Sequence, residues 1–363
     1  MIDFIPLDYY FFLYLHGSLL LVLFTFLHSL FLSLDDRRNL SYINIAGYLL
    51  LIVLSIYIGL RPVSGKYFID MRTYETHFNY YANGGAIVSV KDVFFHLFMK
   101  ISASILTVNN FFLLCAVLYI YPMYRISKSL FKEYWFYAFL IFVVSFQFWP
   151  YGVNGIRNGI ATSFFLLAVS FHSRRFIMVL FLVLAVLFHK SLMLPIFAFG
   201  LTFLFNKPKY ILMGWVAAIP FSLVLGGYME SIFTSLGFAD DRLSAYLGDE
   251  SSSGGFRFDF LIYSASAVFV GWYYIFRKNF QDKLYNQIFN TYLITNAFWI
   301  LIIRANFSNR FAYLSWFMIG LVIIYPFLKE RFYKNQNIVI GFVLLMYFGF
   351  TYFMYGIYYS GIK

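Results

Sequence analysis

The sequence predicts an all-α polytopic membrane protein. Of its 363 residues, 62% are hydrophobic and only 12% are charged, whereas a soluble domain carries roughly 45–50% apolar and about 25% charged residues. A chain this apolar cannot bury its surplus in one core, because much of a folded surface stays exposed. The basic residues stand in short clusters between long apolar runs, as the positive-inside rule predicts. Soluble, disordered, collagen-like and coiled-coil classes are therefore excluded.

The apolar runs divide the chain into about twelve predicted membrane spans, since a spanning helix needs about 20 mostly apolar residues. The N-terminus, Met1-Ile2-Asp3, lacks the basic segment of a signal peptide, so we expect the first run to remain as a membrane helix. Several later runs are short for a full crossing, and we expect them to be re-entrant or longer than their apolar part. In chain order the predicted spans are 9–34, 43–60, 111–124, 134–149, 156–171, 176–188, 192–205, 210–225, 258–276, 285–303, 311–328 and 338–358.

Basic clusters in alternate loops orient these spans. They hold more than half of the 27 Lys and Arg residues, and the positive-inside rule places them in the cytoplasm. Both termini then lie outside, as do two longer segments, 61–110 and 226–257, and we expect residues 1–363 to form one integral membrane domain. The net charge of +11 is thereby assigned to topology, and nucleic acid is excluded as a partner. The clusters lie at 35–38, 125–132, 174–175, 207–209, 277–283 and 329–334.

Arginines dominate the basic residues that remain on the outer side. Topology requires positive charge inside and does not call for arginine outside. The planar fork of arginine matches two phosphate oxygens at once, so arginines near outer helix ends predict a phosphate-binding cavity shared between spans. For any single one of them the alternative is snorkelling or ion pairing at the interface. They are Arg61, Arg72, Arg157, Arg242, Arg257, Arg304 and Arg310.

A glycine-rich segment, 149–161, joins two predicted spans on the outer face. Its glycines allow a tight entry into the next helix, and we expect Asn154 to cap that helix. Arg157 then falls in the first turn, where backbone N–H groups and the helix dipole already favour an anion. Because a positive charge is unfavourable there without an anion, Arg157 is a candidate catalytic residue and Asn154 a candidate substrate-binding residue. The alternative is a capped surface turn with a snorkelling arginine.

The segment Phe188-His189-Lys190-Ser191 lies at another outer boundary, one helical hairpin from Arg157. A neutral imidazole can accept a hydroxyl proton, and an imidazolium can contact phosphate. His189 is therefore a second candidate catalytic residue, with an ordinary interfacial histidine as the alternative.

Carboxylates, an arginine and several tyrosines between residues 66 and 81 favour carbohydrate binding. Carboxylates accept sugar hydroxyls, and aromatic rings cover the apolar faces of sugars. Asp70 is a third catalytic candidate, and Arg72 and Tyr74 are candidate substrate-binding residues. The segment 93–105 that follows is expected to be an amphipathic interfacial helix. The alternative is an ordinary aromatic belt, since 24% of the chain is aromatic.

The second outer segment and the last outer loop add further candidate substrate-binding residues. No HExxH, CxxC, P-loop or Rossmann motif occurs, and the six His are too scattered for a metal cluster. We therefore expect neither a metal nor a cofactor, and serine hydrolase chemistry has no nucleophile elbow. The additional candidates are Arg242, Tyr246, Arg257, Arg304 and Arg310.

The series of outer motifs resembles the EpsG family of Wzy-like exopolysaccharide polymerases. The resemblance extends over nearly the whole chain and is carried by the order of the motifs. The family commonly has Arg-Gln where this chain has Arg157-Asn158. The matching features are Asp70…Tyr74, Asn154-Gly155-Ile156-Arg157-Asn158-Gly159-Ile160-Ala161, Phe188-His189-Lys190-Ser191, Arg242…Tyr246 and Asn309-Arg310-Phe311-Ala312-Tyr313.

The resemblance implies an enzyme that extends a bacterial surface polysaccharide at the outer face of the inner membrane. A GT-C-like architecture is compatible with this activity. Its substrates would be oligosaccharide repeat units linked to undecaprenyl diphosphate, in the lipid bilayer, with other polysaccharide export proteins as further candidate partners. Fixed cations would stabilise the departing diphosphate without a metal. A carboxylate or histidine would deprotonate the acceptor hydroxyl, and the sequence leaves Asp70, Glu75, His189 and Asp259 open as that base.

Two other functions remain open from the sequence. One is a polytopic glycosyltransferase that uses a polyprenyl-phosphate monosaccharide donor with Asp70 as base. The other is a flippase or transporter of lipid-linked oligosaccharide, which should carry charges near the bilayer midplane and broken helices in both halves. The spans are nearly free of charge, which favours an enzyme.

Overall fold

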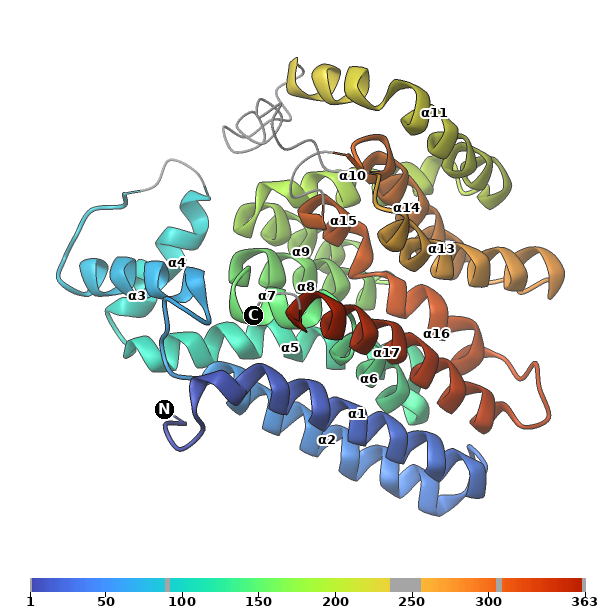
Figure 1. Ribbon diagram of the computed structural model, residues 1–363, viewed down its shortest axis with the longest axis horizontal. Coiled ribbons are helices and arrows are strands. Elements are labelled where there is room, and N and C mark those ends of the chain that lie inside the picture. The colour runs from blue at the N-terminus through green and yellow to red at the C-terminus, as the bar shows by residue number, and fades with distance from the viewer. Residues whose placement is uncertain (1, 89–91, 236–255, 305–308, 361–363) are drawn as a thin grey trace. The chain divides into compact units, whose positions relative to one another are not determined.

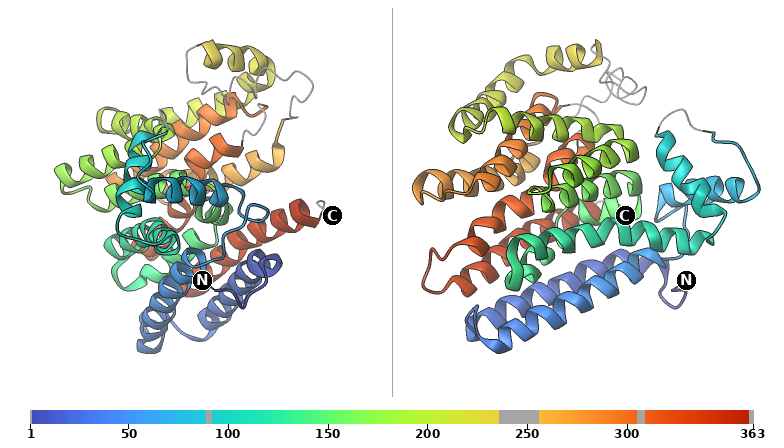
Figure 2. Two further views of the ribbon diagram at one scale, coloured as in Figure 1. Left: turned by 90° about the vertical axis from the view of Figure 1, so that its left-hand side faces the viewer. Right: turned by 180° about the vertical axis from the view of Figure 1, so that it is seen from behind.

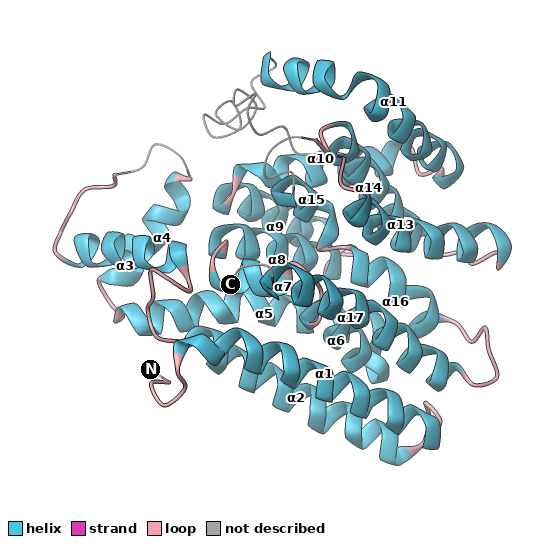
Figure 3. Cartoon of the chain, viewed as in Figure 1, coloured by secondary structure: helices cyan, strands magenta, loops and turns pink. Residues whose placement is uncertain are grey.

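The computed structural model describes residues 2–88, 92–235, 256–304 and 309–360, and within these ranges the chain is helical and contains no strand (Figure 3). The prediction of an all-α membrane protein is confirmed. Seven helices in this part of the chain are long and apolar enough to cross a membrane, and shorter apolar helices of 10–17 residues accompany them. The number of about twelve spans stays a prediction.

The chain divides into two compact units, each described by itself below. Unit 1 comprises Met1–Leu192 and Phe327–Lys363, and unit 2 comprises Met193–Pro326. One integral membrane domain remains the expectation for the whole chain. The helices of unit 1 are α1 (Leu7–Phe31), α2 (Arg37–Gly59), α3 (Ile69–Ala82), α4 (Val93–Ala103), α5 (Val108–Phe131), α6 (Trp135–Val143), α7 (Phe148–Val153), α8 (Ile156–Ser170), α9 (Arg175–Phe188) and α17 (Gln336–Ser360), with 3₁₀ turns at Lys132–Tyr134 and Lys190–Leu192.

The long helices of unit 1 lie along one another. The helices α1 and α2 run antiparallel, and α17 packs along α1 (Figure 1). The Asp36 side chain starts α2 by accepting a hydrogen bond from the backbone N–H of Arg38 at 2.8 Å, the usual role of aspartate at an N-cap. Behind this layer α5 packs against both α2 and α8, and α8 packs against α9. These contacts bury α8 almost completely.

The predicted span 134–149 is broken in the structure. It forms α6 and α7, which are separated by a turn at Val144–Gln147. Tyrosines from three other helices donate hydrogen bonds to carbonyls around the break: Tyr14 to Val143 at 2.7 Å, Tyr355 to Phe146 at 2.5 Å and Tyr119 to Phe148 at 3.0 Å. Inside a membrane an open backbone carbonyl is expensive unless neighbouring side chains satisfy it. The three tyrosine hydroxyls provide the hydrogen bonds that these carbonyls need. The break is therefore stabilised by tertiary contacts.

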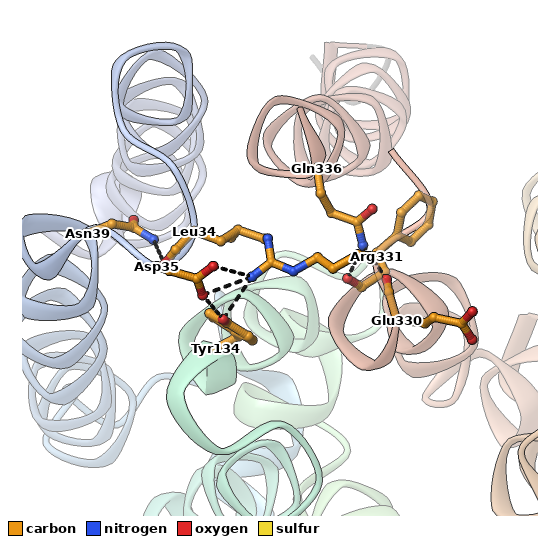
Figure 4. A network of polar contacts seen from close by, with 8 residues as sticks. Leu34, Asp35, Asn39, Tyr134, Glu330, Arg331 and Gln336 are labelled. Atoms are coloured by element: carbon orange, nitrogen blue, oxygen red, sulfur yellow. Dashed lines mark hydrogen bonds and ion pairs between the residues drawn. The ribbon is translucent and has the colours of Figure 1, made fainter. Parts of the chain in front are cut away.

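One end of unit 1 gathers the loops that carry basic clusters. Arg331 donates to both carboxylate oxygens of Asp35, at 2.9 and 3.0 Å, and to the hydroxyl of Tyr134 at 2.9 Å (Figure 4). The Ser129 hydroxyl near the end of α5 donates to the carbonyl of Ser170 at the end of α8 at 3.2 Å. Four of the loops predicted to be cytoplasmic therefore meet here, and we call this the Asp35 end.

The opposite end of unit 1 lies across the length of α2, roughly 35 Å away at 1.5 Å per residue. Here the backbone N–H of Ile2 donates to the carbonyl of Leu60 at 2.9 Å, and the Tyr67 hydroxyl donates to Asp8. The helices α3 and α4 pack on each other and against the start of α5 (Figure 1 and Figure 2). The predicted helix 93–105 is confirmed as α4, which exposes Val93, Leu97 and Ile101 at four-residue spacing. We call this the Arg157 end.

Unit 2 is built around a buried, polar helix. The amide of Asn296 on α14 donates to the hydroxyls of Ser264 and Ser315 at 3.1 and 3.0 Å, and its oxygen accepts from Trp215 Nε1 at 2.8 Å. A second interruption of an apolar run separates α15 from α16 at Phe317–Met318. The helices are α10 (Met193–Leu204), α11 (Pro208–Ser235), α13 (Phe258–Trp272) with a π turn at Tyr273–Arg277, α14 (Lys283–Leu301), α15 (Asn309–Trp316) and α16 (Ile319–Lys329), whose last residues belong to unit 1.

Candidate functional site

The candidate site begins at the turn between α7 and α8. The N-cap of α8 is Gly155, with no side-chain cap, so the expected Asn154 cap is wrong. Asn154 instead ends α7, where its N–H donates to the Pro150 carbonyl at 3.0 Å. Its buried Oδ1 finds no hydrogen-bond partner among the described residues. Because this turn closes one helix and opens the next within two residues, Asn154 belongs to the first helix.

Gly159 allows the start of α8 to lie against this turn. A Cβ atom added at Gly159 would lie 2.7 Å from the Tyr151 carbonyl oxygen and 3.1 Å from the Tyr119 ring. Both distances are shorter than ordinary van der Waals contact, and the nearer one meets backbone that cannot move aside. A glycine at this position is therefore required for the close approach of α7 and α8.

Arg157 lies in the first turn of α8, as the sequence predicts, and two residues from the α3–α4 region hold it. Its Nη1 donates to Asp92 Oδ2 at 2.7 Å, and its Nε donates to the Tyr74 hydroxyl at 3.2 Å. The side chains of Arg157 and Asp92 are only 22% and 11% exposed. The carboxylate of Asp92 supplies a protein anion at the helix N-terminus, where the sequence called for a negative charge. The Nη2 of Arg157 has no partner among the described residues.

Asp92 is the site residue that sequence reasoning missed. It is 65 residues from Arg157 in sequence, and nothing in either local motif links the two. The available signal was its position as an isolated acid directly before the amphipathic helix. An acid there reads as a helix cap, and its long-range contact follows only from the packing of α4 against α9 and α5.

Tyr74 connects α3 to Arg157. Its side chain is buried, and its ring lies in edge contact with Phe95 of α4, with centroids 5.5 Å apart. Burial raises the pKa of Tyr74 above its ordinary value, more than the neighbouring guanidinium lowers it. Tyr74 therefore remains a neutral phenol, able to accept from Arg157 Nε and to donate its own proton.

Asp70 and Arg72 lie on the exposed side of α3. Asp70 is close enough to interact electrostatically with both Tyr74 and Arg157. Arg72 pairs with Glu75 at 3.2 Å across one helical turn, and its side chain is 69% exposed. The structure thus brings Asp70 to the Arg157 end together with Tyr74, whereas Arg72 is occupied by a surface ion pair.

His189 is linked to the first turn of α8 through Ser191. The His189 Nδ1 and the Ser191 hydroxyl lie 2.6 Å apart, and that hydroxyl donates to Asn158 Oδ1 at 3.3 Å. Asn158 directly follows Arg157, so the two predicted catalytic residues share one helix terminus. The side-chain amide of Asn158 accepts a hydrogen bond from the loop that carries His189.

Two further histidines lie behind Tyr74. The Tyr81 hydroxyl and His96 Nδ1 are 2.9 Å apart, and the rings of His96 and His77 have centroids 5.4 Å apart. Burial, followed by the nearby His77 and Arg157, lowers the pKa of His96 below its ordinary value. These residues join α3 and α4 into one layer over Arg157.

Arg61 proves to be structural. It is 2% exposed, its Nη2 donates to the Val153 carbonyl at 2.9 Å, and its Nη1 donates to the Ile58 carbonyl. Its guanidinium lies 5.2 Å from the centre of the Phe68 ring. Arg61 therefore ties the end of α2 to the end of α7 and helps to fix the turn from which Arg157 projects.

The remaining predicted arginines belong to unit 2. Arg257 forms a two-point ion pair with Asp259, at 2.9 and 2.6 Å, and stacks over Phe260 at 3.7 Å. Arg304 donates to the Leu223 carbonyl at 3.2 Å, and Arg310 lies at the start of α15. Arg242 and Tyr246 lie outside the described residues. The structure therefore assembles Asp70, Tyr74, Arg157 and His189 within unit 1, and leaves the substrate-binding predictions for unit 2 as predictions.

Within the described ranges, no three His, Cys, Asp or Glu side chains are grouped in a way that could hold a metal ion. Arg157 and the N-terminus of α8 place positive charge at this site.

Comparison with known proteins gives one finding on the whole chain. The EpsG family profile matches residues 44–362, a range that includes every site residue described above. No curated protein and no solved structure is significantly similar to the chain.

Proposed function

Because the chain belongs to the EpsG family, which is associated with glycosyl transfer in polysaccharide biosynthesis, we propose that it is a polysaccharide polymerase of the bacterial inner membrane. It joins oligosaccharide repeat units carried on undecaprenyl diphosphate at the outer face of the inner membrane. The observation that carries the proposal is Arg157, which is fixed at the N-terminus of α8 with its Nη2 left for a ligand. A diphosphate is the leaving group that such a cationic site would stabilise.

In the proposed reaction a hydroxyl of the acceptor unit attacks the anomeric carbon of the growing chain. The bond between that carbon and the diphosphate oxygen breaks, and the lipid diphosphate leaves with the electron pair. Arg157 and the helix terminus stabilise the charge that develops on the leaving oxygen. The hydroxyl proton passes to a base at the same end of unit 1, for which His189 and Asp70 are the candidates.

Metal ions are not needed in this scheme. Arg157 and the dipole of α8 provide the charge stabilisation that Mg²⁺ gives in many phosphate-handling enzymes. Polymerisation by the purified protein should accordingly persist in excess EDTA. Loss of activity in EDTA, restored by Mg²⁺ or Mn²⁺, would show that the arginine-based scheme is wrong.

The decisive experiment supplies the purified protein with a lipid-linked repeat unit and no nucleotide sugar. A polymerase converts this single substrate into a ladder of longer lipid-linked products. A glycosyltransferase that uses a polyprenyl-phosphate monosaccharide leaves the repeat unit unchanged until that donor is added. A transporter leaves it unchanged in both cases.

The transporter remains the second candidate because of one structural observation. Interrupted apolar helices occur in both units, at Val144–Gln147 and at Phe317–Met318, and broken helices in both halves are typical of transporters. The polar residues at the Arg157 end favour the enzyme, since they combine an arginine suited to phosphate binding with candidate general bases. Movement of a fluorescent lipid-linked oligosaccharide across proteoliposomes, without chain extension, would support the transporter instead.

A further inference from the structure

Asp92 takes up a position that its own helix does not explain. It stands at the N-cap of α4, where an aspartate usually accepts a hydrogen bond from the helix's backbone N–H groups. Its carboxylate makes no such cap, and its backbone lies in the left-handed region at φ 50°. This region is uncommon for residues other than glycine, although aspartate adopts it more readily than most. What Asp92 contacts instead is Arg157 Nη1, at 2.7 Å.

The two contacts of Arg157 leave a defined set of donors. Nε is used by the Tyr74 hydroxyl, and one hydrogen of Nη1 is used by Asp92. Both hydrogens of Nη2 and the second hydrogen of Nη1 have no partner among the described residues. Two anchors on different nitrogens prevent the planar guanidinium from turning, so the remaining donors point in one fixed direction.

Both anchors come from the same layer of the molecule. Tyr74 lies on α3 and Asp92 directly precedes α4, and the ring of Tyr74 packs against Phe95 one turn into α4. The α3–α4 layer therefore holds the guanidinium of Arg157, while α8 carries its backbone.

We propose that Asp92 is a positioning residue, which together with Tyr74 holds the guanidinium of Arg157 so that its remaining donors meet two oxygens of the leaving diphosphate. This inference rests on the function proposed above, and it adds how the cation is oriented for that reaction. Orientation of this kind matters most in the transition state, because prearranged donors need no reorganisation when charge develops.

Two other roles for Asp92 lead to different kinetics. As a competing anion, Asp92 would occupy the place of the diphosphate, and its removal would improve binding without slowing the reaction. As a purely structural clip between α4 and α8, its loss would lower thermal stability and impair binding and turnover together. A positioning carboxylate reduces kcat when removed and leaves KM nearly unchanged, since the loss of a neighbouring negative charge does not weaken anion binding.

The test compares wild type with Asp92→Asn and Asp92→Glu in steady-state polymerisation of the lipid-linked repeat unit. We expect Asp92→Asn to lower kcat about tenfold, as for loss of one hydrogen bond to a charged group, with KM within about twofold of wild type. Asp92→Glu keeps the carboxylate and should recover at least part of the lost kcat. Asp35→Asn is the matched control, because it removes the acid of an Asp–Arg–Tyr cluster at the other end of unit 1, and it should behave as wild type.

The outcomes separate the alternatives. Tighter binding with unchanged or higher kcat would overturn positioning in favour of competition. A lower kcat together with a higher KM and a lower Tm, and no recovery in Asp92→Glu, would overturn it in favour of a structural clip.

A second readout does not depend on polymerisation. In protein labelled with ¹⁵N-arginine, the side-chain signal absent from Arg157→Lys identifies Arg157. That signal should report a rigid guanidinium in wild type and a mobile one in Asp92→Asn. A rigid signal in both would overturn the inference even if the protein polymerises its substrate. A change in mobility would support the positioning of Arg157 by Asp92, while the absence of polymer from wild type would contradict the proposed function separately.

Discussion

The two ends of unit 1 contain the same three residue types in different arrangements. At the Asp35 end, Arg331 contacts Asp35 and Tyr134 entirely through Nη2, and the two charged side chains are 48% and 72% exposed (Figure 4). At the Arg157 end, the contacts to Asp92 and Tyr74 use Nη1 and Nε, and the pair is mostly buried. At the exposed Asp35 end, all hydrogen bonds of the arginine come from one nitrogen. At the Arg157 end, two nitrogens of the arginine are bound and Nη2 is unused.

The difference shows why an Asp–Arg–Tyr combination is not by itself a site. An exposed ion pair gains little, because water screens it and the long side chains lose entropy. A pair withdrawn from water interacts more strongly, and removing one partner leaves the other charge without compensation. Burial, unused donors and the neighbouring helix N-terminus distinguish the Arg157 end as a candidate anion site. The Asp35 end is a connection between loops.

The largest effect that separates the two ends is their side of the membrane. In a Cys115→Ser background, which removes the buried native cysteine, single cysteines at positions 72 and 331 can be labelled in intact spheroplasts. We expect a membrane-impermeant maleimide to label position 72 directly and position 331 only after permeabilisation. Labelling with the opposite pattern would place the Arg157 end in the cytoplasm and contradict the proposed function.

The next largest effect is expected from Arg157→Lys. Lysine keeps the charge but offers one compact ammonium in place of the fork, so it cannot contact Asp92, Tyr74 and a diphosphate in the same geometry. We expect polymer yield to fall by about 100- to 1000-fold, the range found when a principal oxyanion donor is removed. The measurement is chain-length distribution on gels, with Arg38→Lys, in its exposed surface pair with Asp36, as the control. Full-length polymer from Arg157→Lys would rule out fork-specific recognition.

The sequence predicted the fold well where hydropathy alone decides it. The ends of α1 and α17 lie within three residues of the predicted spans, and α2 begins six residues before its predicted span. Long apolar runs between charged loops have few alternatives. The break between α6 and α7 escaped prediction, because only Ser145 and Gln147 interrupt the apolar run there. The tyrosines whose hydroxyls bind the backbone carbonyls at the break come from helices before and after it in the sequence.

At the site, the sequence identified the residues that local chemistry marks. Arg157 follows a glycine-rich turn, and His189 and Tyr74 stand in polar segments between spans, so each was visible in its own motif. Asp92 was not, since its role depends on how α4 packs rather than on its neighbours in sequence. Asn154 was assigned to the wrong helix, because the turn between α7 and α8 is shorter than the pattern suggested.

A smaller, pH-dependent effect is expected at the Arg157 end. The pKa of His96 is lowered from 6.5 in the folded protein, first by burial and then by His77 and Arg157, while Asp92 opposes them. Below about pH 6.5 the unfolded chain therefore binds a proton that folded His96 resists, and stability falls as the pH drops. Thermal unfolding should therefore show a lower Tm at pH 5.5 than at pH 7.5.

His96→Gln tests that assignment, because glutamine can still hydrogen-bond to Tyr81 but does not titrate. It should reduce the difference in Tm between pH 5.5 and pH 7.5. His172→Gln, at the exposed turn beyond α8 on the Asp35 end, should leave the difference as in wild type. An unchanged difference in His96→Gln would show that the pH dependence arises elsewhere.

The smallest effect is expected from Arg331→Ala. The substitution removes the contacts of Arg331 with Asp35 and Tyr134, while the hydrogen bond that Tyr134 donates to Asp35 remains. An exposed pair of this kind contributes less than about 1 kcal/mol. The connection between α16 and α17 is also held by Gln336, whose amide donates to the Phe327 and Glu330 carbonyls at 2.5 and 2.6 Å and whose oxygen accepts from the Phe332 N–H at 3.0 Å. Polymer length should therefore match wild type, and Tm should change by no more than a few degrees.

Gln336→Ala at the same loop is the matched comparison and should be the more destabilising of the two, because it leaves buried backbone groups without partners. If Arg331→Ala instead shortened the polymer as much as Arg157→Lys does, the two clusters would be functionally equivalent, and burial with unused donors would no longer explain why one end of unit 1 carries the site.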